Sequence, residues 1–101
     1  MRNVLLVGLK PILVEDVKNK LQLPNVRLFA GSSLEDVRAT FAQTKLDAVI
    51  MGAGIELEKR LEIVREIFLT SETTTVHLKD VATGPEGFLP FVRSVLHGLD
   101  S

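Results

Sequence analysis

The stretch LDAVIMGAGIELEKR, residues 46–60, decides the fold class. Four consecutive apolar residues, 48–51, end at Gly52, and the charged segment that follows has helical spacing. A continuous apolar run predicts a strand buried on both faces of a parallel sheet. Residues 4–7 form a second such run, which ends at Gly8. The two runs predict the central strands of an α/β domain.

Two further strands are expected at the edges of the sheet. Arg27 interrupts the apolar run of residues 26–30, and polar residues alternate with Val76 and Leu78 within residues 73–80. Such interruptions are typical of strands that are less protected from water. With the two apolar strands at the centre, the predicted sheet order is 2-1-3-4.

Helical spacing of apolar residues follows each strand. Pro11 fits the first turn of a helix over residues 11–21, and Ser32 to Glu35 form a capping-box pattern that predicts the start of a second helix. Glu56 with Arg60 and Glu62 with Arg65 are expected to pair on the outer side of the third helix. The apolar stripes expected on the third and fourth helices are Leu57, Leu61, Val64 and Phe68, and Phe88, Val92, Val95 and Leu99.

The element order is therefore βαβαβαβα, and right-handed crossovers give a three-layer α/β/α sandwich with a four-stranded parallel sheet. The length of 101 residues fits a single domain over residues 1–101. The formal net charge is −1, from 12 basic and 13 acidic residues. The chain therefore has no excess of positive charge that would attract the phosphates of a nucleic acid. All five aromatic residues are Phe, and no stacking platform is evident. Nucleic acid is not expected as a partner.

The chain contains no cysteine, which excludes disulfides and cysteine nucleophiles. A cytoplasmic location is expected by default. No apolar run approaches the length of a membrane span, so no membrane association is expected.

Candidate ligand contacts gather where the strands end. Ligands of open parallel sheets bind beyond the carboxyl ends of the strands, where this chain has Gly8, Lys10, Gly52, Gly54 and Lys79. Lys10, just before the first helix, is a candidate for holding a small anion together with helix N–H groups. The alternatives are a solvated lysine at residue 10 and an edge-strand pair of Lys79 with Asp80.

Other motifs favour structural roles. Gly52-x-Gly54 lacks the third glycine of a dinucleotide fingerprint, and Glu56 and Glu58 would repel an anion at the following helix. His77 and His97 have no metal-ligand neighbours, so no metal site is predicted. The sequence contains no nucleophile elbow and no acid and base pair, so no catalytic residues or cofactor are assigned.

The segments RNVLLVG, LDAVIMG and FLPFVRSVLHGL resemble the first strand, third strand and last helix of the receiver domains of response regulators. Receivers hold magnesium with an acidic pair after strand one, where this chain has Gly8 to Lys10, and accept phosphate on an aspartate at the end of strand three. That position is Met51 or Gly52 here, and Asp47 lies at the entrance of the strand. Between Asp80 and Phe88 there is no room for a further helix and fifth strand. The resemblance implies a shortened receiver without the phosphorylation chemistry.

A weaker resemblance is to the IIB components of cellobiose-type sugar phosphotransferase systems, which have a similar length and four parallel strands. LDAVIMGAG is similar to their third-strand region. Their phosphorylated cysteine follows strand one, where this chain reads Gly8-Leu9-Lys10-Pro11, so that activity does not carry over.

The sequence favours a non-catalytic, receiver-like module for protein interaction or regulation. A protein partner or a homodimer is expected to contact the last helix, whose apolar residues exceed one stripe. The competing hypothesis is a binder of a small anion or nucleotide, or an unrecognised enzyme, that uses the strand ends. The interface residues expected on the last helix are Phe88, Leu89, Phe91, Leu96 and Leu99.

Overall fold

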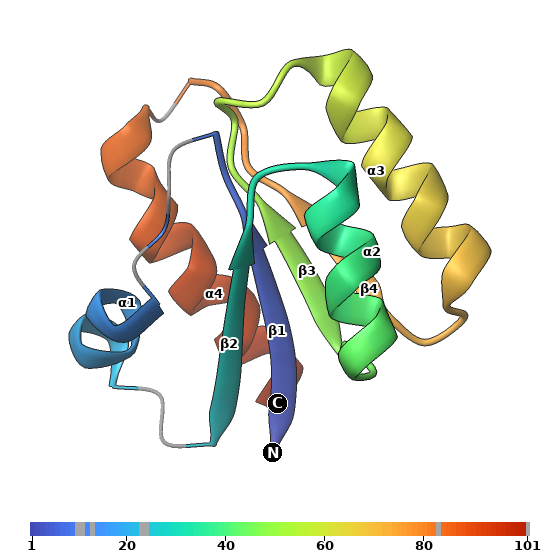
Figure 1. Ribbon diagram of the computed structural model, residues 1–101. Coiled ribbons are helices and arrows are strands. Elements are labelled where there is room, and N and C mark those ends of the chain that lie inside the picture. Colours follow the sequence, from blue (N-terminus) through green and yellow to red (C-terminus); the bar gives the residue numbers. More distant parts are fainter. Residues whose placement is uncertain (10–11, 13, 23–24, 83, 101) are drawn as a thin grey trace.

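A computed structural model describes residues 1–9, 12, 14–22, 25–82 and 84–100. Four parallel strands form one sheet in the order β2-β1-β3-β4 (Figure 1). This order confirms the expected sheet, with β1 and β3 central and β2 and β4 at the edges. The strands are β1 (Arg2–Val7), β2 (Val26–Gly31), β3 (Ala48–Met51) and β4 (Thr75–Leu78).

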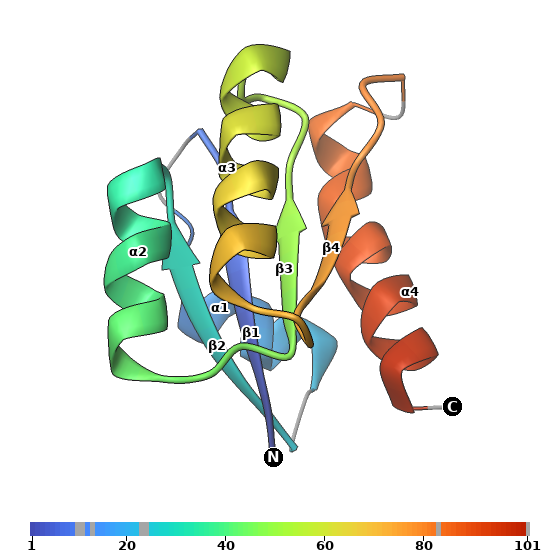
Figure 2. The ribbon, with the colours of Figure 1, turned by 90° about the vertical axis from the view of Figure 1, so that its right-hand side faces the viewer.

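Four α-helices cover both faces of the sheet, which confirms the α/β sandwich predicted from the sequence. Helices α1 and α4 lie on one face, and α2 and α3 lie on the other (Figures 1 and 2). The short 3-10 turn η1 (Pro85–Gly87) leads directly into α4. The helices are α1 (Val14–Leu21), α2 (Leu34–Gln43), α3 (Leu57–Thr70) and α4 (Phe88–Asp100).

The alternation of side chains along the central strands divides the interior into two cores. Val4 and Leu6 of β1 point toward α1 and α4, where Val92 and Leu96 are buried. Leu5 and Val7 point the other way, toward α2 and α3. Because both faces are covered, β1 from Val4 onward and all of β3 are buried, as their continuous apolar runs predict.

Asp47 has a structural role at the amino end of the sheet. Its carboxylate accepts a hydrogen bond from the Asn3 backbone N–H at 2.7 Å, and its own N–H donates to the Asn3 carbonyl at 2.8 Å. These contacts place Asp47 at the entrance of β3, as expected, and far from the strand ends where a receiver carries its acceptor.

The helix starts differ from the expectations. Helix α1 begins at Val14, and the expected start at Pro11 lies outside the described residues. The cap of α2 is shifted by one residue, because Ser33, and not Ser32, accepts from the Asp36 backbone N–H at 3.2 Å. Asp36, and not Glu35, reaches back to the Ser32 N–H at 2.8 Å, and this hydrogen bond lowers the pKa of its carboxyl group.

The stripe predicted to be buried on α3 is wrong. Leu57, Leu61 and Phe68 are 58%, 51% and 60% exposed, whereas Ile63 and Ile67 are buried against the sheet. Helix α3 has apolar residues on two adjoining faces, and the β-branched pair faces the core. The expected pairs Glu56–Arg60 and Glu62–Arg65 are not among the ion pairs of the described residues, where Glu66 instead pairs with Arg38 of α2 at 2.7 Å.

The expected exposed patch on α4 is also corrected. Leu96 is 3% exposed and belongs to the core between α4 and the sheet. The other members of that expected interface are partly buried against the same core, because α4 rests on the sheet and on α1: Phe88, Leu89, Phe91 and Leu99. Four of the large apolar side chains that are exposed in the described chain lie on α3 instead: Leu57, Leu61, Phe68 and Leu69.

Candidate ligand site at the strand ends

A cavity of about 370 Å³ lies at the carboxyl ends of β1, β3 and β4. Four of the five residues that the sequence assigns to a ligand site line this cavity, and the fifth, Lys10, lies outside the described residues. The fold brings the four together because parallel strands all end at the same edge of the sheet. The cavity is lined by Gly8, Leu9, Ile12, Gly52, Ala53, Gly54, Lys79, Val81, Gly84, Pro85 and Phe88.

Two glycines shape the mouth of the cavity. A Cβ atom at Gly54 would lie 3.3 Å from the Leu9 Cβ, which is closer than ordinary contact, so glycine lets these two loops approach each other. Gly84 has a φ of 71°, a left-handed conformation that favours glycine. This turn directs the chain from β4 into η1 and α4, and so places Phe88 against the cavity.

Lys79 is the only charged side chain among the cavity-lining residues, all of which are described. It directly follows β4 and is only 4% exposed. Its Nζ donates a hydrogen bond to the Asp80 carbonyl at 3.0 Å and lies 3.8 Å from the Asp80 carboxylate. The expected pair of Lys79 with Asp80 is therefore present, but Lys79 is buried and only Asp80 is exposed. A buried ammonium is costly unless other groups compensate its charge.

Arg60 of α3 lies beside this lysine. Its guanidinium donates to the Lys79 carbonyl at 3.2 Å, and its buried Nε has no hydrogen-bond partner among the described residues. Spacing along the sequence predicts a pair with Glu56, four residues earlier, and gives no signal for this contact. The contact arises because α3 crosses over the end of β4.

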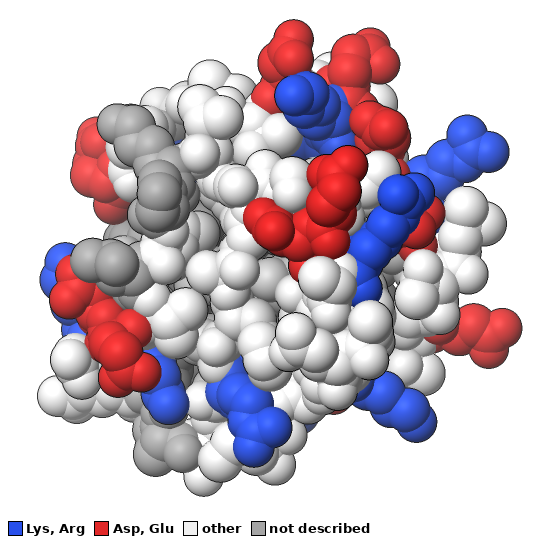
Figure 3. Space-filling model, in the orientation of Figure 1, with Lys and Arg blue, Asp and Glu red and all other residues white. Residues whose placement is uncertain are grey.

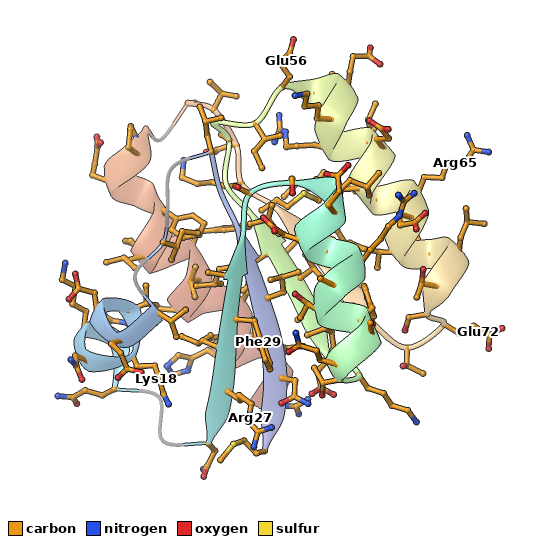
Figure 4. All side chains as sticks on the ribbon, in the orientation of Figure 1. Lys18, Arg27, Phe29, Glu56, Arg65 and Glu72 are labelled. Atoms are coloured by element: carbon orange, nitrogen blue, oxygen red, sulfur yellow. The ribbon has the colours of Figure 1, made fainter. Side chains whose placement is uncertain are left out.

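The backbone N–H groups at the strand ends are already used. Gly8 donates to Gly31 at 3.1 Å, Gly52 donates to Val7 at 2.9 Å, and Lys79 donates to Met51 at 2.9 Å. These bonds continue the ladder of the sheet, so these three groups are not available to cradle a phosphate. Glu56 extends from the start of α3 away from the molecule (Figure 4), consistent with a helix start that does not receive an anion.

The two histidines lie away from the cavity lining. His77 contacts Thr75 Oγ1 through Nε2 at 2.9 Å, and partial burial lowers its pKa. His97 is exposed on α4. Within the described ranges, no group of three histidine, cysteine or acidic residues is arranged to hold a metal ion.

Sequence reasoning missed most of the apolar wall of the cavity. Ile12 and Val81 belong to no motif, and Phe88 is assigned to the apolar stripe and the expected interface of the last helix, not to the strand ends. The one available signal is the Gly84-Pro85 turn, which predicts that the chain reverses direction just before Phe88.

The fold and the cavity together define an α/β domain with a flavodoxin-like sheet and a largely apolar site at its strand ends. A comparison with protein-family models, with curated proteins and with solved structures found no match to this chain. None of the described helices is long and apolar enough to cross a membrane.

Proposed function

We propose that this domain binds a small amphipathic anion, with the apolar body of the ligand in the cavity and its anionic group on Lys79. The observation that supports the proposal is the buried ammonium of Lys79 in an otherwise uncharged cavity lining. Binding sites of this kind combine apolar walls with a few placed polar groups that orient the ligand.

The size of the cavity and its donors define the class of ligand. A volume of about 370 Å³ is at the lower end of the range for small-molecule sites. Because the N–H groups of Gly8, Gly52 and Lys79 are bonded within the sheet, they offer nothing to a pyrophosphate. A single carboxylate on a short apolar chain or ring fits these walls better than a nucleotide does.

Lys79 has the donors that such a ligand needs. An ammonium group has three donors, and the hydrogen bond to the Asp80 carbonyl uses one of them. The Asp80 carboxylate, 3.8 Å away, balances the charge but is beyond hydrogen-bond distance. A bound carboxylate would replace this loose pair with a direct, charge-assisted hydrogen bond.

The proposal is tested by an NMR titration of the ¹⁵N-labelled protein with hexanoate and, separately, with hexanol. We expect hexanoate to shift the amide signals of Gly52 and Gly54 and to bind at least about tenfold more tightly than hexanol, the size of one charge-assisted contact. Lys79→Met should remove this preference, whereas Lys59→Met, which alters an exposed lysine of α3, should retain it. Equal binding of hexanoate by the wild type and by Lys79→Met would refute the role of Lys79.

A second candidate function is the non-catalytic, receiver-like module for protein interaction or regulation. It is supported by the flavodoxin-like sheet order and by the lack of a carboxylate among the residues that line the cavity. The specific observation in its favour is the exposed apolar flank of α3. The two proposals are compatible, because a ligand in the cavity could serve as the input of a regulatory module.

A further inference from the structure

Helix α3 presents an apolar stripe that no other described element covers. Leu57, Leu61 and Phe68 are each more than half exposed, and the partly buried Val64 completes the stripe. Spacings of four, three and four residues place these side chains on one continuous face. Exposed apolar surfaces of this extent typically mark interaction sites.

The stripe lies on the flank of α3 that faces the open edge of the sheet. Glu66 pairs with Arg38 of α2, and Ile63 and Ile67 face the sheet. With about 100° between successive residues, the stripe falls on the side of the helix opposite α2. That side is next to β4, whose Leu78 is 40% exposed. In Figure 2, viewed toward this side, β4 lies between α3 and α4 with its outer edge in the foreground.

The outer edge of β4 retains its capacity for strand pairing. The N–H groups of Thr75 and Lys79 donate inward to β3, at 3.0 and 2.9 Å. Because backbone groups alternate in direction along a strand, those of Val76 and Leu78 point outward. Edge strands are usually protected by proline or exposed charge. Residues 75–78 contain neither proline nor a residue with permanent charge, and the side chain of Lys79 is buried.

The stripe and the charges beside it are self-complementary. In an antiparallel pair of α3 helices with Leu61 opposite the partner's Val64, Leu57 lies opposite the partner's Phe68. Glu58 and Arg65 border the stripe on its solvent side. In this register each Glu58 is displaced from the partner's Arg65 by two residues, about 3 Å along the helix, which is within reach of the two long side chains. Figure 4 shows Arg65 extending away from the molecule. On the face in Figure 3, acidic and basic side chains are interspersed over α2 and α3.

We propose that a second copy of this chain binds at this edge through a twofold axis. The axis, perpendicular to the sheet at His77, pairs β4 with the partner's β4 in antiparallel orientation, and Val76 exchanges hydrogen bonds with the partner's Leu78. The same rotation brings the two α3 flanks together in antiparallel orientation. One twofold rotation therefore buries the apolar stripe against the partner's stripe, provides hydrogen-bond partners for the outward backbone groups of β4, and brings Glu58 near the partner's Arg65.

Sedimentation velocity from about 10 µM to about 1 mM protein tests the dimer. We expect a reversible dimer in the wild type. Leu61→Glu should raise its dissociation constant at least about tenfold, as the loss of a central apolar contact does. Leu69→Gln is the control, because Leu69 is 74% exposed on the same helix but lies outside the stripe, and a neutral amide adds no charge beside Arg65; it should change the constant less than about twofold. Circular dichroism verifies that each variant is folded.

Two further variants test the arrangement itself. Leu78→Pro removes an outward N–H that the monomer does not use and should prevent the dimer while leaving the monomer folded. Glu58→Arg and Arg65→Glu should each weaken the dimer about threefold to tenfold, and the double variant should return to near the wild-type value.

A wild type that remains monomeric at 1 mM would overturn the proposal. A dimer that persists in Leu61→Glu and Leu78→Pro would also overturn it, as would a double charge variant weaker than either single one. These outcomes are independent of the Lys79 site, because none of the substituted residues lines the cavity.

Discussion

Helices α3 and α4 have comparable apolar content but use it differently. Helix α4 buries Val92 and Leu96 completely or nearly so, and its remaining apolar residues pack against the same core. Helix α3 buries Ile63 and Ile67 and leaves Leu57, Leu61 and Phe68 in water. Similar spacing of apolar residues therefore leads to opposite exposure.

The neighbours of each helix explain the difference. Helix α4 lies against the sheet beside α1, so apolar side chains on the two sides of its stripe still find contacts. Helix α3 has α2 on one side, where Arg38 and Glu66 form an ion pair between the two helices. On its other side is the open edge of β4. A helix over a sheet edge has one flank without a neighbour, and any apolar residues there remain exposed unless another molecule covers them.

The largest test of this contrast is a charge in the core of α4. Leu96→Asp should destabilise the fold by more than about 4 kcal/mol, since it places an unpaired carboxylate among apolar side chains. Urea unfolding followed by circular dichroism measures the effect. Ser94→Asp, on the exposed side of the same helix, should change the stability by less than about 0.5 kcal/mol. A folded Leu96→Asp with near wild-type stability would restore the surface role that the sequence assigns to Leu96.

A smaller effect separates two adjacent residues of α3. Ile67→Ala should cost about 2–5 kcal/mol, because it leaves a cavity beneath the helix. Phe68→Ala should cost less than about 0.5 kcal/mol in the monomer, although it removes more apolar surface, since most of that surface is already in water. Both are measured by urea unfolding at micromolar concentration, where self-association does not contribute. Equal losses would mean that the stripe is buried after all.

The smallest effect concerns pH and the α4 side of β4. His77 is paired in register with Ile50 of the α4-side core, and burial lowers its pKa below 6.5. The unfolded chain then binds more protons between the two pKa values, so stability is full above about pH 6.5 and falls as the pH drops toward the folded pKa. We expect the urea midpoint to decrease from pH 7.5 to 5.5, and to decrease less in His77→Gln. An unchanged pH dependence in that variant would assign the loss to other groups.

Much of the candidate site could be predicted from the sequence. The apolar runs that end at Gly8 and Gly52 identify the central strands, and parallel strands must end at one edge. This rule assigns Gly8, Gly52, Gly54 and Lys79 to one edge of the sheet, and all four line one cavity. The burial of Lys79 was not predictable, because a lysine after an edge strand is ordinarily exposed.

Continuous and alternating apolar patterns report burial along one element, and they therefore predict the order of the elements, the central and edge strands and the helices on both faces of the sheet. Tertiary contacts, in contrast, set which stripe of α3 faces the core, the burial of Leu96, and the position of Lys79 in the lining of an apolar cavity. These outcomes depend on which neighbours surround an element. The burial of a given side chain depends on contacts between residues that are distant in the chain, and the local spacing of apolar residues does not predict those contacts.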